Sequence, residues 1–332
     1  MTQSETTSTT ELPRLDLSAA EPGSDAERRA ALELDRACRE VGFFTLCGHG
    51  IPLQVFEEAF AQSRAFFALP YAEKDRCRLP EGVTRAADDY TPYGYSGMLE
   101  ENAFAYTGKQ GLPSDYVEKV SVGRLVLDDG EPLPLPTDAA GAALRAALKA
   151  YFVACEAVTA RLAELFSIAL DLPRDFLTRR TGRSTDLLRS QRYPDLSDAL
   201  VNDQGMGEHT DGTLITLLAQ TGPGIQVRDR GGGWITPILP ALDTLLVNIG
   251  DLMARWSNDT YVSTPHRVVL GSARQSIVFF KLANDDTVIE CFPKFCRDAP
   301  AKYAPVVYKD FSLQKMNALF GRDGAADAGA IG

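Results

Sequence analysis

The chain of 332 residues has no long hydrophobic run. No segment approaches the roughly 20 consecutive apolar residues that a membrane-spanning helix requires. The first residues, MTQSETTSTTELPRLDL, also lack the basic start and the apolar stretch of a secretory signal. We therefore expect a cytoplasmic protein that has no membrane partner.

Positive charge is scarce as well. Lysine and arginine total 34 against 45 aspartates and glutamates, which gives a formal net charge of -11. Proteins that bind nucleic acid neutralise phosphates with clustered basic side chains, so this composition argues against a nucleic-acid partner. The 45% hydrophobic content is instead that of an ordinary globular protein with a sizeable core.

Cysteine is limited to six residues, and none of them forms a CxxC pair. Because the chain has no secretory signal, we expect buried, reduced thiols rather than a disulfide framework. Cys291 and Cys296, in CFPKFC, are the only close pair, and a metal site built on them would lack two further ligands.

The order of the hydrophobic patterns predicts helices first and strands later. Apolar residues recur at helical spacing over residues 25–41, 52–68 and 137–173, whereas the aromatic run at 43–47 is typical of a strand. From residue 187 onward, short β-type runs alternate with turn residues about every 8–12 residues, as in a β-sandwich or jelly roll. The predicted fold is therefore α+β, with helices surrounding a double-stranded β-helix (jelly roll) core.

The same patterns divide the chain into segments. We expect residues 1–12 to be disordered and residues 13–180 to be mainly helical, with residues 79–123, where tyrosines are scattered, forming a lid. The jelly-roll core is expected at residues 181–310. Residues 311–332 should hold a C-terminal helix and a flexible tail.

Histidine occurs only three times in the chain. His209 stands two residues before Asp211 in GEHTDG, and side chains at i and i+2 of a strand point to the same face. His266, in STPHRVV, lies in another predicted strand. Two imidazoles and one carboxylate are the ligand set of non-haem Fe(II) oxygenases, which keep coordination positions open. From these three residues alone, a catalytic zinc site remains an alternative.

A second polar pair follows on a later predicted strand. Arg274 and Ser276, in RQS, share one strand face, and an arginine that faces a barrel interior is costly unless an anion meets its guanidinium. A carboxylate is the natural ligand of this pair. The site therefore calls for a metal-binding acid with a second, distal carboxylate, and 2-oxoglutarate has that form.

These motifs together carry a family resemblance. With HTD, the distal histidine and RQS in order, the chain resembles the iron(II)/2-oxoglutarate-dependent oxygenases of the isopenicillin N synthase-like family. GFFTLCGHGIP, FFALPYAEK, RYP and GDLMARWSNDTYVSTPHRVV extend the resemblance over nearly the whole chain. It implies that iron is bound by His209, Asp211 and His266, and the distal carboxylate of 2-oxoglutarate by Arg274 and Ser276.

The segment QRYP resembles the NYYP segment of the family. The resemblance assigns Tyr193 to the 2-oxoglutarate site, and Gln191 can replace the usual asparagine as a hydrogen-bonding amide. Arg192 departs from the family pattern because it introduces a charge. Four residues are our candidates for contacts with the primary substrate: Tyr95, Glu118, Arg192 and Phe280.

The reaction implied by the resemblance consumes 2-oxoglutarate and O2 and releases succinate and CO2. A small-molecule substrate, such as an amino acid or a natural-product intermediate, is hydroxylated, desaturated or cyclised. Isopenicillin N synthase itself keeps the Arg-x-Ser pair, so an oxidase that uses Fe(II) and O2 without 2-oxoglutarate is the alternative within the family. A non-catalytic, carboxylate-binding β-barrel is the alternative from another class.

Overall fold

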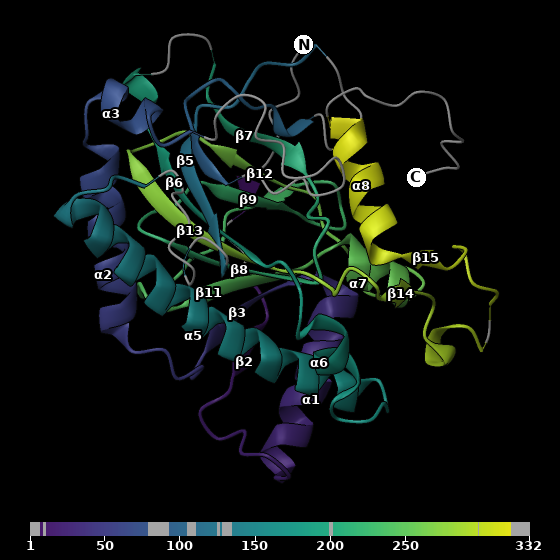
Figure 1. Cartoon of the computed structure of the whole chain (residues 1–332). Coiled ribbons are helices and arrows are strands. Elements are labelled where there is room, and N and C mark those ends of the chain that lie inside the picture. The colour runs from purple at the N-terminus through teal and green to yellow at the C-terminus, as the bar shows by residue number, and fades with distance from the viewer. Residues whose placement is uncertain are drawn as a thin grey trace.

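The structure is a computed structural model that describes residues 7–8, 11–78, 93–104, 111–124, 127, 135–198, 202–297 and 299–319. Two β-sheets lie at its centre (Figure 1). The five-stranded sheet has the order β1 (Thr7–Ser8), β10 (Trp234–Ile235), β9 (Ile225–Arg228), β12 (His266–Val269) and β7 (Gln204–His209).

The second sheet has eight strands. Their order is β2 (Arg14–Asp16), β3 (Phe43–Cys47), β11 (Leu245–Ile249), β8 (Ile215–Gln220), β13 (Arg274–Lys281), β6 (Leu187–Tyr193), β5 (Glu118–Gly123) and β4 (Gly94–Ser96). The pairs within this sheet are antiparallel except β2 with β3. Its central strands pack on both faces, so they are almost fully buried.

Alternation along the strands separates two apolar layers. On β13, Val278 points between the two sheets, where it packs with Leu218 and Val227. Ile277 and Phe279 point the other way, into the larger core beneath the helices. The arrangement confirms the predicted α+β fold, with helices around a jelly-roll core.

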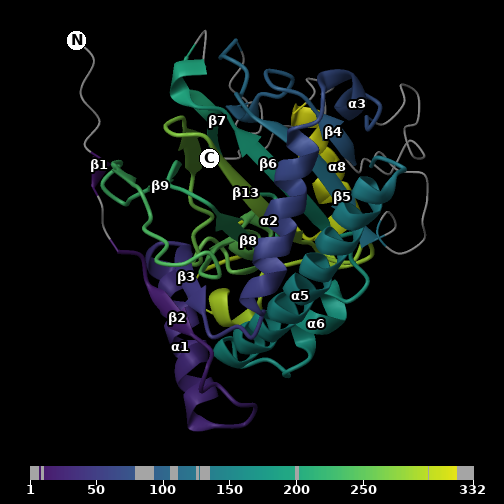
Figure 2. The ribbon, with the colours of Figure 1, turned by 90° about the vertical axis from the view of Figure 1, so that its left-hand side faces the viewer.

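Three long helices cover the outer face of the eight-stranded sheet. They are α1 (Asp25–Glu40), α2 (Leu53–Phe67) and α5 (Ala139–Ala169), and Figure 2 shows α2 and α5 crossing in front of the sheet. Asp138 caps the N-terminus of α5, because its carboxylate accepts a hydrogen bond from the Gly141 amide. Because Phe152 of this helix meets Phe279 of β13 with ring centroids 5.0 Å apart, the helix is fixed against the sheet.

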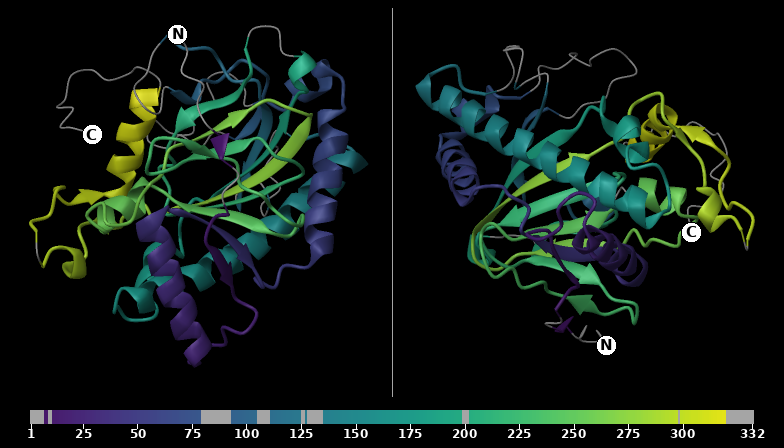
Figure 3. Two further views of the ribbon diagram at one scale, coloured as in Figure 1. Left: turned by 180° about the vertical axis from the view of Figure 1, so that it is seen from behind. Right: turned by 90° about the horizontal axis from the view of Figure 1, so that it is seen from below.

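The remaining elements are short. They are α3 (Tyr71–Asp75), α6 (Phe176–Thr181), α7 (Asp251–Trp256), α8 (Tyr308–Leu319), the 3-10 helices η2 (Leu196–Asp198) and η3 (Pro293–Phe295), and a two-stranded sheet of β14 (Val288–Ile289) and β15 (Val306–Val307). Helix α8 lies on the side of the sheets opposite to α2 (Figure 3). Over the described ranges, no helix is long and apolar enough to cross a membrane.

Two of the predicted segments are described only in part. The proposed lid, residues 79–123, contains the strands β4 and β5. Because β5 pairs along its whole length with β6, and β4 pairs with β5, this part of the segment belongs to the eight-stranded sheet. Residues 79–92 and 105–110 of that segment are outside the described part. Within residues 1–12, which we expected to be disordered, Thr7–Ser8 pair with β10 and Leu12 is buried. The predicted tail beyond α8 is likewise outside the described residues.

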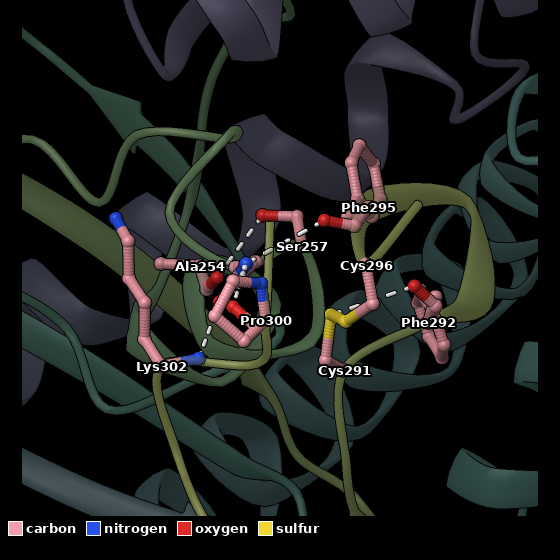
Figure 4. Close-up of a disulfide and its surroundings, with 9 residues drawn as sticks. Ala254, Ser257, Cys291, Phe292, Phe295, Cys296, Pro300 and Lys302 are labelled. Atoms are coloured by element: carbon pink, nitrogen blue, oxygen red, sulfur yellow. Dashed lines mark hydrogen bonds between the residues drawn. A yellow bond between two sulfur atoms is a disulfide. The ribbon is translucent and has the colours of Figure 1, made fainter. Parts of the chain in front are cut away.

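The prediction of reduced thiols is wrong for one pair. Cys291 and Cys296 form a disulfide (Figure 4). The 3-10 turn of η3 lies between them and brings their Cα atoms to 6.7 Å, within bridging range. The other four cysteines are free: three are buried and Cys47 is half-buried.

Candidate functional site

Two neighbouring strands bring the predicted metal ligands together. His209 is the last residue of β7 and His266 the first of β12, and the two face each other across the strand pair. Asp211 follows β7 by two residues, and its Oδ1 lies 3.8 Å from the Nε2 atom of each histidine. One ligand atom from each residue can be chosen so that all three lie within 4.8 Å of one another. This spacing fits one shared metal ion.

The backbone orients both imidazoles. His209 Nδ1 lies 2.8 Å from the carbonyl oxygen of Gly207, and His266 Nδ1 lies 3.2 Å from that of Thr264. A carbonyl can only accept, so each Nδ1 donates to it, and each Nε2 lies on the side of Asp211. Metal-binding histidines are commonly oriented in this way.

Two polar side chains hold the Asp211 carboxylate. Its Oδ2 accepts hydrogen bonds from Thr216 Oγ1 at 2.7 Å and from Asn248 Nδ2 at 2.8 Å. Both donors come from adjacent strands, β8 and β11, which pair so that Thr216 is opposite Asn248. The carboxylate is therefore fixed with Oδ1 toward the imidazoles.

The protonation states also suit a metal. Burial lowers the pKa of His209 to about 3, with a further contribution from the neighbouring His266, so this imidazole is neutral at pH 7. Burial raises the pKa of Asp211, but the two histidines and the hydrogen bonds from Asn248 and Thr216 outweigh it and leave the pKa below its usual value. Neutral imidazole and ionised carboxylate are the forms that bind a divalent metal.

Replacement of Thr216 tests the support of this carboxylate. Thr216→Val keeps the shape but removes one donor to Asp211, so we expect the affinity for Fe(II) to fall about 10-fold or more, as is usual for groups that orient ligands. Equilibrium titration with Fe(II) under argon measures it. The matched control is Thr159→Val, which removes a buried hydroxyl of α5 that donates a hydrogen bond to the backbone carbonyl oxygen of Cys155. Equal Fe(II) affinity in the two variants contradicts the role of Thr216.

A cavity of about 630 Å³ opens beside the three ligands. Its wall includes Gln191 and Tyr193 of β6, Phe280 of β13 and the side chains of α8 that face the sheets. The helix contributes Tyr308, Lys309, Phe311, Ser312, Leu313 and Lys315. The cavity therefore lies between the jelly roll and the C-terminal helix, with the metal ligands in its wall.

The predicted carboxylate pair lies next to this cavity. Ser276 Oγ donates to Gln191 Oε1 at 3.1 Å, and the guanidinium of Arg274 stacks over the ring of Tyr193 at 4.3 Å. Arg274 also borders a smaller cavity of about 360 Å³ that it shares with Tyr193. The sheet thus places all four predicted 2-oxoglutarate residues in one contiguous group.

Arg274 is buried with unused donors. Only 6% of the residue is exposed, and one guanidinium nitrogen donates to Gln220 at 3.0 Å. The other two nitrogens, Nε and Nη2, are buried without a hydrogen-bond partner, and burial lowers the pKa of the group. Unmet buried donors of this kind are destabilising unless a ligand accepts from them. The group therefore fits the distal carboxylate of a dicarboxylic acid.

Three of the four predicted substrate contacts lie away from the cavity. Glu118 is on the helix-facing side of β5, where it accepts from Lys74 at 2.6 Å, from Tyr95 at 2.8 Å and from Arg192 at 2.5 Å. Arg192 sits directly opposite Glu118 on β6. These residues form an ionic cluster beneath α2 and α3, outside the wall of the cavity that holds the metal ligands. Phe280 does line the cavity.

Sequence reasoning missed several residues of the site. Asn248 is the only polar residue in the strand LLVNI, which was a usable signal. Arg189 stands two residues before Gln191, so strand alternation places it on the same face, and it lines the cavity. The contribution of α8 had no signal in the sequence, because it depends on where the chain returns after β15.

Comparison with protein families finds two matching models. Residues 12–134 match the N-terminal domain described as non-haem dioxygenase in morphine synthesis. Residues 184–282 match the 2OG-Fe(II) oxygenase superfamily. The second match contains all three candidate metal ligands and the RQS motif.

Similar proteins with a described activity occur in fungi, plants and bacteria. A 2-oxoglutarate-Fe(II) type oxidoreductase of Emericella nidulans is 30% identical over 90% of this chain and 88% of its own. A homoarginine-6-hydroxylase of Glycine max is 33% identical over 78% of each chain. Validamycin A dioxygenase of Streptomyces hygroscopicus is 32% identical over 79% of this chain and 72% of its own.

Solved structures are similar over almost the whole chain. T7H of Neurospora crassa in complex with alpha-KG has a TM-score of 0.79 and 26% identity, covering 92% of this chain and 96% of the other. The same protein was also solved with alpha-KG and thymine, with a TM-score of 0.78.

Proposed function

Because the chain belongs to the 2OG-Fe(II) oxygenase superfamily, within the isopenicillin N synthase-like family, we propose residue roles for its site. His209, Asp211 and His266 bind the iron, and Arg274 with Ser276 binds the distal carboxylate of 2-oxoglutarate. The protein is a non-haem dioxygenase that uses Fe(II), 2-oxoglutarate and O2. When bound, iron and 2-oxoglutarate supply the oxidation of a substrate C–H bond with release of succinate and CO2.

Two observations together support these roles best: the three metal ligands converge on one point, and Arg274 is buried nearby with unused hydrogen-bond donors. The three ligands converge, with Asp211 Oδ1 3.8 Å from the Nε2 atom of each histidine. Arg274 is buried with two donors unmet. Tyr193 and Gln191 contact both the cavity and the Arg274–Ser276 pair, so we assign them to the same co-substrate.

The two alternatives are less well supported. Relatives with a named activity are 2-oxoglutarate-dependent oxygenases, which favours this co-substrate over an oxidase that uses only Fe(II) and O2. A non-catalytic barrel would have no need for a buried carboxylate and two buried imidazoles that converge on one point, because burying such groups is costly without a ligand that they share.

The substrate is a small molecule, and we propose an amino acid or a natural-product intermediate. Relatives are named for homoarginine and for validamycin A, and one solved relative was crystallised with thymine. The cavity of about 630 Å³ has a size suited to such molecules. Its wall combines apolar side chains, among them Phe280, with charged ones.

Succinate formation tests the proposed function. The purified protein, loaded with Fe(II) under argon and then exposed to O2, should convert 2-oxoglutarate to succinate, slowly alone and faster with a true substrate from an amino-acid and natural-product panel. Protein loaded with Zn(II) is the control and should form none. Oxygen consumption without any need for 2-oxoglutarate would favour the oxidase alternative, and failure to bind iron would favour the non-catalytic barrel.

A further inference from the structure

Five cationic side chains are buried in the described part of the chain. Three of them have a carboxylate partner, which is the usual condition for burying a charge. Lys74 pairs with Glu118, Lys119 with Glu101, and Lys281 with Asp186. The two that remain are Arg189 and Arg274. Both belong to the sheet face that points toward the other sheet, and Arg274 already has a proposed ligand.

Arg189 lines the large cavity and is 8% exposed. Its Nε donates to Ser121 Oγ at 3.2 Å, and its guanidinium lies 5.4 Å from the centre of the Phe280 ring. These contacts fix the plane of the guanidinium and use one of its five N–H donors. Among the described residues, no carboxylate forms an ion pair with it.

Nearby carboxylates are already engaged. Glu101 is bound by Lys119 and accepts from Ser96 at 3.2 Å. Asp115 accepts from the backbone amides of Ala103 and Gly207, both at 2.8 Å, and from Gln204. The negative charges of Glu101 and Asp115 partly balance the positive charges of Lys119 and Arg189 without a direct contact to Arg189. They leave the terminal nitrogens of Arg189 for a ligand in the cavity.

The two arginines can bind different anions at the same time. In the strand pair β6–β13, Tyr193 is opposite Arg274, whereas Arg189 is opposite Val278. Four residues along a strand correspond to roughly 13 Å. An anion at Arg189 therefore leaves room for 2-oxoglutarate at Arg274, and the metal ligands border the same cavity.

We propose that Arg189 binds a carboxylate of the primary substrate and so selects acidic substrates. The carbon skeleton then packs on the apolar side chains that share the cavity wall with Arg189. These are Leu187, Leu218, Ile225, Val278 and Phe280. The inference rests on the proposed function, since it names the substrate class of the same site.

Matched acids and amides test this proposal without turnover. The full-length protein is loaded with Zn(II) and saturated with 2-oxoglutarate, so that the metal ligands and Arg274 are occupied. Phenylacetate and hexanoate are then titrated by calorimetry beside the neutral isosteres phenylacetamide and hexanamide. We expect both acids to bind more tightly than their amides. Arg189→Met should weaken the acids about 10- to 100-fold and leave the amides unchanged.

Two further variants separate binding from folding. Arg189→Lys keeps the charge without the planar fork and should retain part of the preference for acids. Arg28→Met, at an exposed arginine of α1, should change nothing. The affinity of each variant for 2-oxoglutarate is measured in the same way and should stay within about twofold of the wild type, a difference too small to reflect a lost contact.

Three outcomes overturn the proposal: acids that bind no better than amides, an equal loss of both in Arg189→Met, or a loss of 2-oxoglutarate affinity in that variant. The first two remove a carboxylate site at Arg189, and the third assigns the residue to the co-substrate. Failure of the proposed function is distinct, because it appears as absence of 2-oxoglutarate binding by the wild-type protein.

Discussion

Arg274→Met should strongly weaken 2-oxoglutarate binding and yet leave the protein as stable as before, or more so. Truncating one partner of a buried, hydrogen-bonded charge pair costs about 2–5 kcal/mol, so the affinity should fall at least roughly 30-fold. In the absence of ligand, the same arginine is buried with two nitrogens unpartnered. An apolar side chain of similar volume removes that penalty, and the free energy of unfolding should stay constant or rise by up to about 4 kcal/mol.

Lys281→Met is the matched control on the same strand. Lys281 is also buried, but its Nζ lies 2.7 Å from Asp186, so its removal leaves a buried carboxylate uncompensated. We expect a loss of about 3–5 kcal/mol in unfolding free energy with 2-oxoglutarate affinity retained. Urea denaturation of the ligand-free proteins and calorimetric titration measure the two quantities. If Arg274→Met loses stability as Lys281→Met does, Arg274 has a structural role instead.

His266→Ala should remove iron binding and, with it, all 2-oxoglutarate-dependent activity. Changes to residues that only orient ligands cost about 10- to 100-fold in metal affinity, so loss of a ligand should exceed about 100-fold. Metal content after dialysis against Fe(II) under argon, and succinate formation, provide the two readings.

The third histidine of the chain supplies the control for this prediction. His49 donates from Nε2 to the carbonyl of Asp243 at 2.7 Å and accepts from the Ile51 amide at 3.1 Å, which fixes a turn rather than a metal. His49→Ala should lower stability by about 1–3 kcal/mol because it leaves buried groups unpaired. Its iron content should equal that of the wild type. Retention of iron by His266→Ala would contradict the assigned ligand set.

Local strand alternation was enough to predict much of the site. Arg274 and Ser276 share one face of β13, as their spacing of two residues indicates. For His209 and Asp211 the rule gave the right neighbours for the wrong reason, because β7 ends at His209 and the Asp211 carboxylate is held by Thr216 and Asn248 instead. The same rule places Phe280 in the cavity wall, where the structure has it. It also argues against Arg192, which is adjacent to Gln191 and therefore points to the opposite face. The charge of Arg192 suggested a substrate contact, but its position in the strand directs it to Glu118.

Other features depend on pairings that a single sequence does not contain. Which face Glu118 occupies is determined by the register of β5 against β6, where it meets Arg192. Tyr95 joins the same cluster because β4 pairs with β5 in turn. The wall formed by α8 depends on the path of the chain after the jelly roll, and local pattern carries no information on that path. The chemical character of each side chain was therefore easier to interpret from the sequence than its position, which depends on pairings between distant segments.

The most direct test of the account is an anaerobic titration of the purified protein, first with Fe(II) and then with 2-oxoglutarate, followed by visible absorption. Chelation of iron by the co-substrate gives a charge-transfer band. The account predicts that this band saturates at one equivalent of each component and is lost in Arg274→Met at the same concentrations. Iron binding without the band would contradict the assignment of Arg274 and Ser276 to 2-oxoglutarate, and absence of iron binding would contradict the metal site itself.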